Sequence, residues 1–172
     1  EKEFYGSDIV YLGAWQPYIE LLINELTPYH LKVWGNQWYK LRGYPQLKKC
    51  WQGEGVGLFE EMAKVINSSK IIFNVIRYHN GNGHSMKTFE IPACGGFMLT
   101  NRTDEQLDFF PEDKCAVYFS TKEELKDKIK YYLNNVSECI RISKAGYEAA
   151  RPHTYFERAK KILNMYEKIK LV

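Results

Sequence analysis

The sequence has no long apolar segment and little excess of either charge. No apolar run approaches the roughly 20 residues that span a bilayer, and no signal peptide is recognisable. The net charge of +3 in 172 residues is too small to argue for a nucleic-acid partner. We therefore expect a cytoplasmic protein with no transmembrane segment and no nucleic-acid function.

Cysteine is also scarce, with four residues and no C-x-x-C pair. Such spacing suits reduced thiols in a cytoplasmic protein better than a disulfide framework or a zinc site. His79 and His84 flank an Asn-Gly-Asn-Gly loop. They have no adjacent cysteine or carboxylate, so loop polarity explains them better than a metal does. We predict no metal site.

The common nucleotide-binding fingerprints are missing as well. The turn Gly13-Ala14-Trp15 is not G-x-G-x-x-G, and the glycine-rich stretch 53–57 lacks a strong preceding strand and a Gly-Lys-Ser/Thr ending. No Ser/His/Asp triad or nucleophilic cysteine constellation stands out, which argues against acyl transfer.

What is present is the composition of one globular domain, with 45% hydrophobic and 26% charged residues. Short apolar runs predict strands at 8–13, 31–34, 70–75, 97–100 and 115–119. Helical patterns are found at 17–27, 58–68, 85–94, 103–110, 121–134, 136–150 and from 154 onward. We expect residues 36–55 to form a loop with a short helical turn.

Strands that alternate with helices predict an α/β fold, a doubly wound, Rossmann-like parallel sheet with helices on both faces. A single domain over residues 1–172 is the natural count. Thr103 with Gln106, and Thr121 with Glu124, have the spacing of capping boxes and predict two helix starts.

The segment 70–101 predicts the most informative unit, a strand, a polar loop and a short helix. Ser85 is the expected N-cap of that helix, which carries Glu90. In this arrangement backbone amides and the helix dipole can meet an anion. An ordinary βαβ unit with a mobile surface loop is the alternative.

Ligands of such sheets bind beyond the carboxyl ends of the strands, here the loops after Gly13, Trp34 and Val75. Arg77 and Lys87 could contact a diphosphate there, or they could be solvated charges at element boundaries. Glu90 could pair with a base such as Arg77 or accept hydrogen bonds from ribose hydroxyls. The loops therefore favour a phosphate-bearing ligand.

Several separated phrases carry a resemblance to a known family. They are FEIPACGGFMLT at 89–100 with Asn74 and Arg77 before it, then EEL at 123–125, YYL at 131–133, AGY at 145–147 and His153-Thr154. Over about 8–162 the chain resembles glycosyltransferases of the GT-B fold, most closely the CgeB-like group among the family 1 and family 4-like enzymes.

The resemblance implies the C-terminal half of such an enzyme, which binds a nucleotide-sugar donor as substrate and needs no further cofactor. By that resemblance Glu90 is the second glutamate of the E-x7-E motif and holds the donor ribose. Lys87 stands where relatives often have Arg, and Gly13 matches the glycine after the first strand. The implied binding residues are Gly13, Ala14, Trp15, Asn74, His84, Ser85, Met86 and Glu90, and the implied catalytic residues are Lys87, Arg77 and Glu90.

The sequence departs from the pattern at Asn82, which occupies the position of the first glutamate. Pro92 lies inside the short helix and predicts a kink there. The chain opens at Glu1 and reaches a strand within ten residues, so we expect a piece of a longer protein that lacks its N-terminal, acceptor-binding half.

Two alternatives remain open. A non-catalytic doubly wound domain, used for interaction or as a degenerate nucleotide-binding relative, is favoured by Asn82 and the aromatic-rich stretch 34–51. An isomerase on the same half-fold would need an acid/base pair that the sequence does not reveal.

Overall fold

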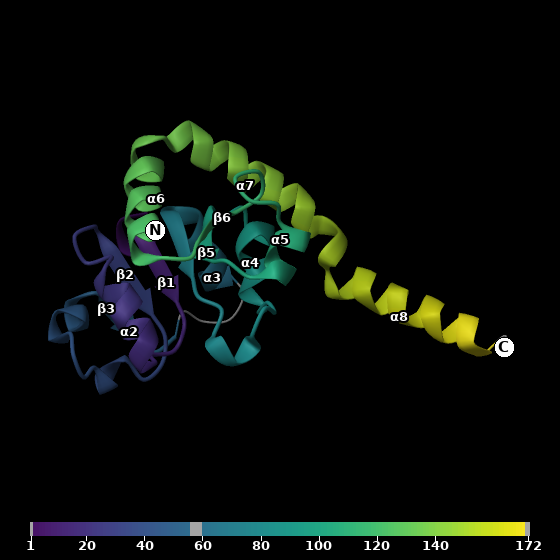
Figure 1. Ribbon diagram of the computed structural model, residues 1–172, viewed down its shortest axis with the longest axis horizontal. Helices are drawn as coiled ribbons and strands as arrows, with labels where there is room; N and C mark the ends of the chain where they lie inside the picture. The colour runs from purple at the N-terminus through teal and green to yellow at the C-terminus, as the bar shows by residue number, and fades with distance from the viewer. Residues whose placement is uncertain (1, 56–59, 171–172) are drawn as a thin grey trace.

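In the computed structural model, which describes residues 2–55 and 60–170, six parallel strands form one sheet (Figure 1). Their order across the sheet is β3-β2-β1-β4-β5-β6. The strands are β1 (Ser7–Leu12), β2 (Leu31–Trp34), β3 (Trp51–Gly53), β4 (Ser69–Asn74), β5 (Met98–Asn101) and β6 (Val117–Phe119). The predicted doubly wound parallel sheet is confirmed.

Helices cover both faces of the sheet. They are α1 (Lys2–Tyr5), α2 (Pro17–Asn24), α3 (Glu60–Ser68), α4 (Lys87–Ala93), α5 (Asp104–Phe109), α6 (Lys122–Asn134), α7 (Val136–Ala150) and α8 (Tyr155–Lys170). Side chains of α2 and α6 pack in one buried cluster, and side chains of α3 and α4 pack in the other. Two helical layers therefore bury the sheet, as parallel strands require.

The central strand β1 shows why this packing follows from the sequence. Ile9 and Tyr11 belong to one buried cluster, and Val10 and Leu12 belong to the other. Successive side chains of a strand point to opposite faces, so a continuous apolar run suits a strand buried on both sides.

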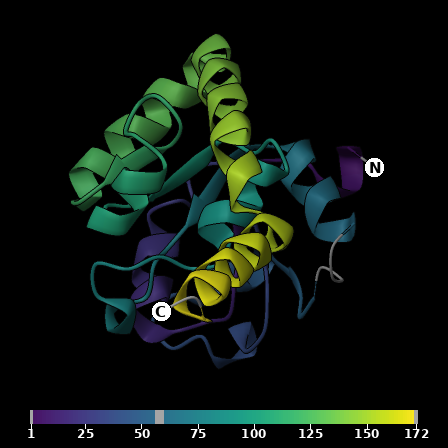
Figure 2. The same cartoon turned by 90° about the vertical axis from the view of Figure 1, so that its right-hand side faces the viewer.

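Helix α8 extends away from the rest of the fold (Figure 1). In Figure 2 the molecule is turned so that the side with α8 faces the viewer. No helix among the described residues is long and apolar enough to cross a membrane.

The loop predicted for 36–55 is wrong in part. It contains the 3-10 turns Trp38–Lys40 and Pro45–Lys49, and then the edge strand β3, whose Trp51 pairs with Val33. A three-residue edge strand shows no alternation to recognise, and its pairing with β2 is a tertiary contact. The expected start of the next helix, near residue 58, lies outside the described residues, as does part of the stretch 53–57.

Of the two predicted capping boxes, one is confirmed in its main contact. The Thr121 hydroxyl accepts a hydrogen bond from the Glu124 N–H at 3.1 Å. The Thr103 hydroxyl makes no cap bond to α5 and instead donates to the Gly83 carbonyl at 2.8 Å. The hydroxyl thus donates to a distant carbonyl and does not accept from the backbone N–H of the first turn, which the sequence pattern could not reveal.

Helix α4, which has Pro92 in its last turn, is ended by a pair of glycines. Gly95 adopts φ +77°, and its N–H donates to the Pro92 carbonyl at 2.8 Å. The Gly96 N–H donates to the Ile91 carbonyl at 3.0 Å. These two bonds form a Schellman motif, so the double glycine ends α4 and turns the chain into β5.

Arg102 ties the end of β5 to the start of α6. Its Nη2 lies 2.6 Å from Glu112 Oε1 and 2.8 Å from Glu124 Oε1. The hydrogen bonds from the guanidinium hold the pKa of both carboxyls below their ordinary value.

We expect Arg102→Met to lower the free energy of unfolding by about 2 kcal/mol, because two partly buried carboxylates lose their donor. Carboxyls with lowered pKa contribute stability above the ordinary value of 4.5 and lose it as the pH falls. Urea unfolding measured from pH 7 to pH 3 should therefore show a smaller acid loss in the variant. Arg151→Met, which breaks only the exposed pair with Glu148, is the control and should change little. An equal acid loss in wild type and Arg102→Met would contradict the assignment.

Candidate functional site

The carboxyl ends of β1 and β2 meet at one edge of the sheet. Leu12 is in register with Trp34, and the Gly13 N–H donates to the Trp34 carbonyl at 2.9 Å. Gly35 adopts φ +147°, and a Cβ built there would lie 2.0 Å from the Gly13 carbonyl oxygen. Only glycine fits, so the two turns pack backbone against backbone and leave space above them.

A cavity of about 390 Å³ opens at this edge, between the ends of β1 and β4 and the start of α4. Seven of the predicted site residues line it, and they are Gly13, Asn74, Arg77, Ser85, Met86, Lys87 and Glu90. Residues that are up to 77 positions apart in the sequence, from Gly13 to Glu90, are thus brought together by the fold.

Lys87 and Glu90 form an ion pair on α4, with Lys87 Nζ 3.0 Å from Glu90 Oε2. Each side chain is 29% exposed and both line the cavity. Glu90 therefore pairs with Lys87 rather than with Arg77, but it stays at the carboxyl edge of the sheet. An ion pair in this position is within reach of a ligand that enters the cavity.

Arg77 makes no ion pair with any carboxylate of the residues described. Burial raises the pKa of the Tyr11 and Tyr18 phenols, and the nearby positive charge of Arg77 opposes this rise. The guanidinium therefore places a positive charge at the wall of the cavity.

The backbone amides of this segment are mostly engaged within the chain. The N–H groups of Phe89 and Glu90 both donate to the Met86 carbonyl at 3.0 Å, and the Gly83 N–H donates to the Asn80 carbonyl at 2.9 Å. Positive charge at the cavity therefore comes mainly from the side chains of Arg77 and Lys87.

Ser85 does not act as the predicted N-cap. Helix α4 begins at Lys87 with Met86 at the N-cap position, and no side chain caps it. Met86 already has helical φ and ψ, and the Ser85 N–H donates to the Thr88 hydroxyl at 3.3 Å. The Ser85 hydroxyl itself is buried and has no hydrogen-bond partner among the residues described, so it caps no amide of the first turn.

Polar atoms without partners gather at this edge of the sheet. The buried side-chain atoms that lack a hydrogen bond, among the residues described, are Tyr18 OH, Trp34 Nε1 and Ser85 Oγ. Ser85 lines the cavity and Trp34 lines an adjoining one. Tyr18 lines neither, and the backbone N–H of Tyr78 lies close enough to its phenol to oppose the rise of its pKa. An unpaired buried polar group costs about 1–3 kcal/mol, so such a cluster marks a site where a ligand can supply the partners.

The adjoining cavity measures about 260 Å³ and shares Leu12, Gly13 and Lys87 with the first. Its other lining residues are Ala14, Trp34, Gly35, Asn36, Glu54, Gly55 and Met62. Ala14, a predicted binding residue, therefore lies beside the site in this second cavity. Sequence reasoning did not select Trp34, although its position at the end of a strand and before a glycine was a usable signal.

Trp15 does not line either cavity. Its side chain is buried in the core, and its Nε1 donates to Glu20 Oε2 at 2.6 Å. The Glu20 carboxylate also accepts from the N–H groups of Gly43 and Tyr44. Trp15 thus holds the loop after β2 against α2.

His84 is also turned away from the main cavity. Its Nδ1 lies 2.5 Å from Glu105 Oε2, and its ring packs edge-on against Phe89. It lines a small cavity of about 110 Å³ with His153 and Arg158, near the start of α8.

Asn82, at the position of the missing first glutamate, is fastened to α5. Its Nδ2 donates to Asp104 Oδ2 at 2.8 Å. Together with the bond from Thr103 to the Gly83 carbonyl, this contact holds the loop against α5. The Asn82 side chain does not line the main cavity.

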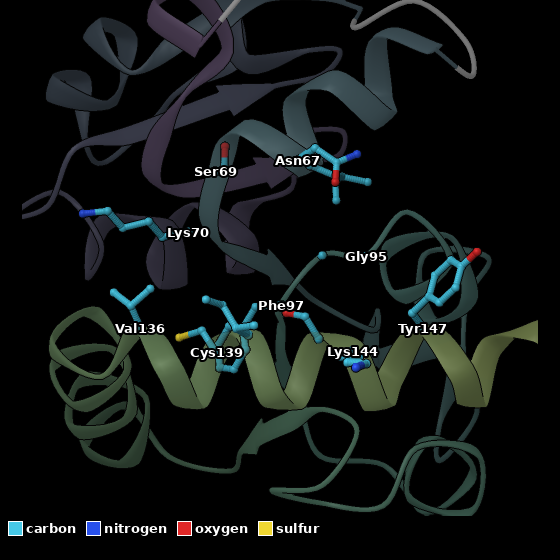
Figure 3. A pocket seen from close by; sticks show the side chains of 13 residues that line it. Asn67, Ser69, Lys70, Gly95, Phe97, Val136, Cys139, Lys144 and Tyr147 are labelled. Carbon is cyan, nitrogen blue, oxygen red and sulfur yellow. The ribbon is translucent and has the colours of Figure 1, made fainter.

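A further cavity, of about 420 Å³, lies at the amino ends of the strands, between α7 and the segments that lead into β4 and β5 (Figure 3). Val136 and Tyr147 of α7 face Asn67, Gly95 and Phe97 there. Two lysines, Lys70 and Lys144, line it, and Lys70 is paired with Asp8 at 2.7 Å. None of the predicted site residues lines this cavity. Its position at the amino ends of the strands makes it the less suitable of the two for a phosphate-bearing ligand.

Among the residues described, no three or more His, Cys, Asp or Glu side chains are grouped so as to hold a metal ion.

Comparison with solved structures shows what this fold is similar to. HepE from Anabaena, in complex with UDP-glucose, matches with a TM-score of 0.71 at 11% identity, over 99% of this chain and 50% of HepE. Sucrose-phosphate synthase from Thermosynechococcus elongatus matches with 0.71 at 14% identity, over 96% of this chain and 46% of the synthase. The present chain spans about half the length of these two proteins.

The C-terminal domain of a glycosyl transferase group 1 family protein, LpcC from Francisella tularensis, also matches. The TM-score is 0.58 at 12% identity, over 91% of this chain and 89% of that domain. At these identities the likeness shows the fold alone, which is that of the C-terminal domain of a group 1 glycosyl transferase.

No curated protein matches the sequence. A family described as glycosyl transferase-like matches residues 16–164, which is most of the chain. The chain therefore belongs to the glycosyl transferase-like family.

Proposed function

We propose that this chain is the donor-binding half of a glycosyltransferase and that a nucleotide-sugar binds in the cavity between β1, β4 and α4. The observation that carries the proposal is the meeting of Arg77, Lys87, Glu90 and the unpaired Ser85 hydroxyl at the carboxyl edge of the sheet. Membership of the family and the complex of HepE with UDP-glucose support it.

Lys87 and Arg77 are proposed to contact the diphosphate. Both side chains line the cavity, and a diphosphate placed between them would give Arg77 the anionic partner that it lacks among the described residues. Glu90, whose Oε2 lies 3.0 Å from Lys87 Nζ, is proposed to accept hydrogen bonds from the ribose. The Ser85 hydroxyl can donate to a phosphate or sugar oxygen, and Gly13 lets that oxygen approach the backbone.

In the proposed reaction the bond between the anomeric carbon and the diphosphate oxygen breaks, and the diphosphate leaves with the electron pair. A bond forms from an acceptor hydroxyl oxygen to the same carbon, and the acceptor proton passes to a base. The two cations stabilise the charge that develops on the leaving group. We place the base and the acceptor site in a separate N-terminal half.

The finer assignments are proposals too. We assign the chain to the CgeB-like group on the strength of the phrases at 89–100 and 145–147. We place the protein in the cytoplasm, which its four free thiols support. We propose that Trp15 and His84 act indirectly, by holding the loops after β2 and β4.

A second candidate is a nucleotide-binding domain without transfer activity, and Asn82 favours it. Its amide is bonded to Asp104, so the contact that relatives make to the transferred sugar through this position is lacking. Donor turnover by the full-length gene product separates the two, because the second candidate predicts binding without release of sugar.

We expect Lys87→Ala and Arg77→Ala each to weaken binding of UDP by about tenfold or more, because each removes a charge-assisted contact worth about 1.5–3 kcal/mol. Isothermal titration at low and high salt measures this, and the salt dependence should fall with each charge removed. Lys144→Ala, at the opposite cavity, is the matched control. Unchanged affinity in both variants would exclude a diphosphate site here.

We expect Glu90→Ala to weaken binding of UDP but not of inorganic pyrophosphate, because the ribose contact is lost and Lys87 remains. The expected loss for UDP is about tenfold. Titration of both ligands into both proteins tests the role. An equal change for the two ligands would show that Glu90 acts only through its pairing with Lys87.

A further inference from the structure

Trp34 differs from the other tryptophans of the chain in one respect. The indole N–H groups of Trp15, Trp38 and Trp51 all donate to oxygen atoms, with Glu20, Gly13 and Gly35 among the acceptors. Trp34 is only 7% exposed, and its buried Nε1 has no acceptor among the residues that the structure describes. An indole N–H can only donate, so what is missing is an acceptor.

The place of Trp34 points to a ligand as that acceptor. It lines the cavity of about 260 Å³ that adjoins the proposed diphosphate site, and Lys87 lines both. We place the base of the nucleotide in this second cavity, which shares Leu12, Gly13 and Lys87 with the first. Gly13 and Gly35 form part of its wall, where their two turns pack closely against each other.

We propose that the indole N–H of Trp34 donates to an exocyclic carbonyl oxygen of the nucleobase and so selects uracil or guanine over adenine. The inference rests on the proposed function and names the class of nucleotide. An exocyclic oxygen projects from the ring and can reach a buried donor. Adenine presents an amino group at that place, which would set a donor against a donor.

NMR of the protein with ¹⁵N-labelled indoles tests the contact without a mutation. Addition of UDP should shift the Trp34 Nε1–H resonance strongly, and the three bonded indoles serve as internal references. Inorganic pyrophosphate should leave the Trp34 signal in place. If UDP binds with measurable heat and the Trp34 resonance does not move, the inference is overturned while the proposed function stands.

Titration with UDP, GDP and ADP tests the selection. Wild type should bind UDP and GDP about tenfold more tightly than ADP, and Trp34→Phe should lose this preference while keeping its affinity for ADP and pyrophosphate. A preference that persists in Trp34→Phe, or that is absent in wild type, overturns the inference. If none of the nucleotides and no pyrophosphate binds, the proposed function falls with it.

Discussion

The parallel pairing of β1 with both β2 and β4 is the constraint on which the rest of the structure depends. Parallel strands bring their carboxyl ends to one edge, so the turns that follow β1, β2 and β4 must meet there. The register Leu12 to Trp34 fixes how closely the first two turns approach. Where the two turns come closest, at position 35, only glycine fits, because a Cβ there would collide with the Gly13 carbonyl oxygen.

Because the turns after β1, β2 and β4 lie together, their charged side chains gather at the carboxyl ends of the strands. Arg77 and Lys87 line the same cavity from the loop after β4 and from α4, and Glu90 is the one carboxylate among the described residues that line it. Arg102, by contrast, is paired with two carboxylates, those of Glu112 and Glu124. An anionic ligand would give the cations at the carboxyl ends of the strands a comparable set of partners.

The loop between β4 and α4 shows how a family pattern can be kept in part. Glu90 lines the cavity, and Asn82, eight residues earlier, is bonded to Asp104 of α5. Thr103 and Glu105 hold the same loop through Gly83 and His84. These hydrogen bonds fasten the loop to α5, so Glu90 lines the cavity and Asn82 does not.

The sequence alone determined the alternation of strands and helices, the burial of the sheet on both faces and the edge at which a ligand would bind. Those features depend on periodicity and on the order of elements along the chain, which a sequence displays directly. It also selected Arg77, Lys87 and Glu90, because strand ends and helix starts are visible as patterns. Only the tertiary structure decided which atoms have partners. Trp15 and Trp34 look alike in the sequence, but a carboxylate on α2 accepts from the first indole, and none of the described residues accepts from the second. The edge strand β3 and the pairing of Lys87 with Glu90 were decided in the same way, because side-chain direction and hydrogen-bond partners depend on which segments the fold packs together.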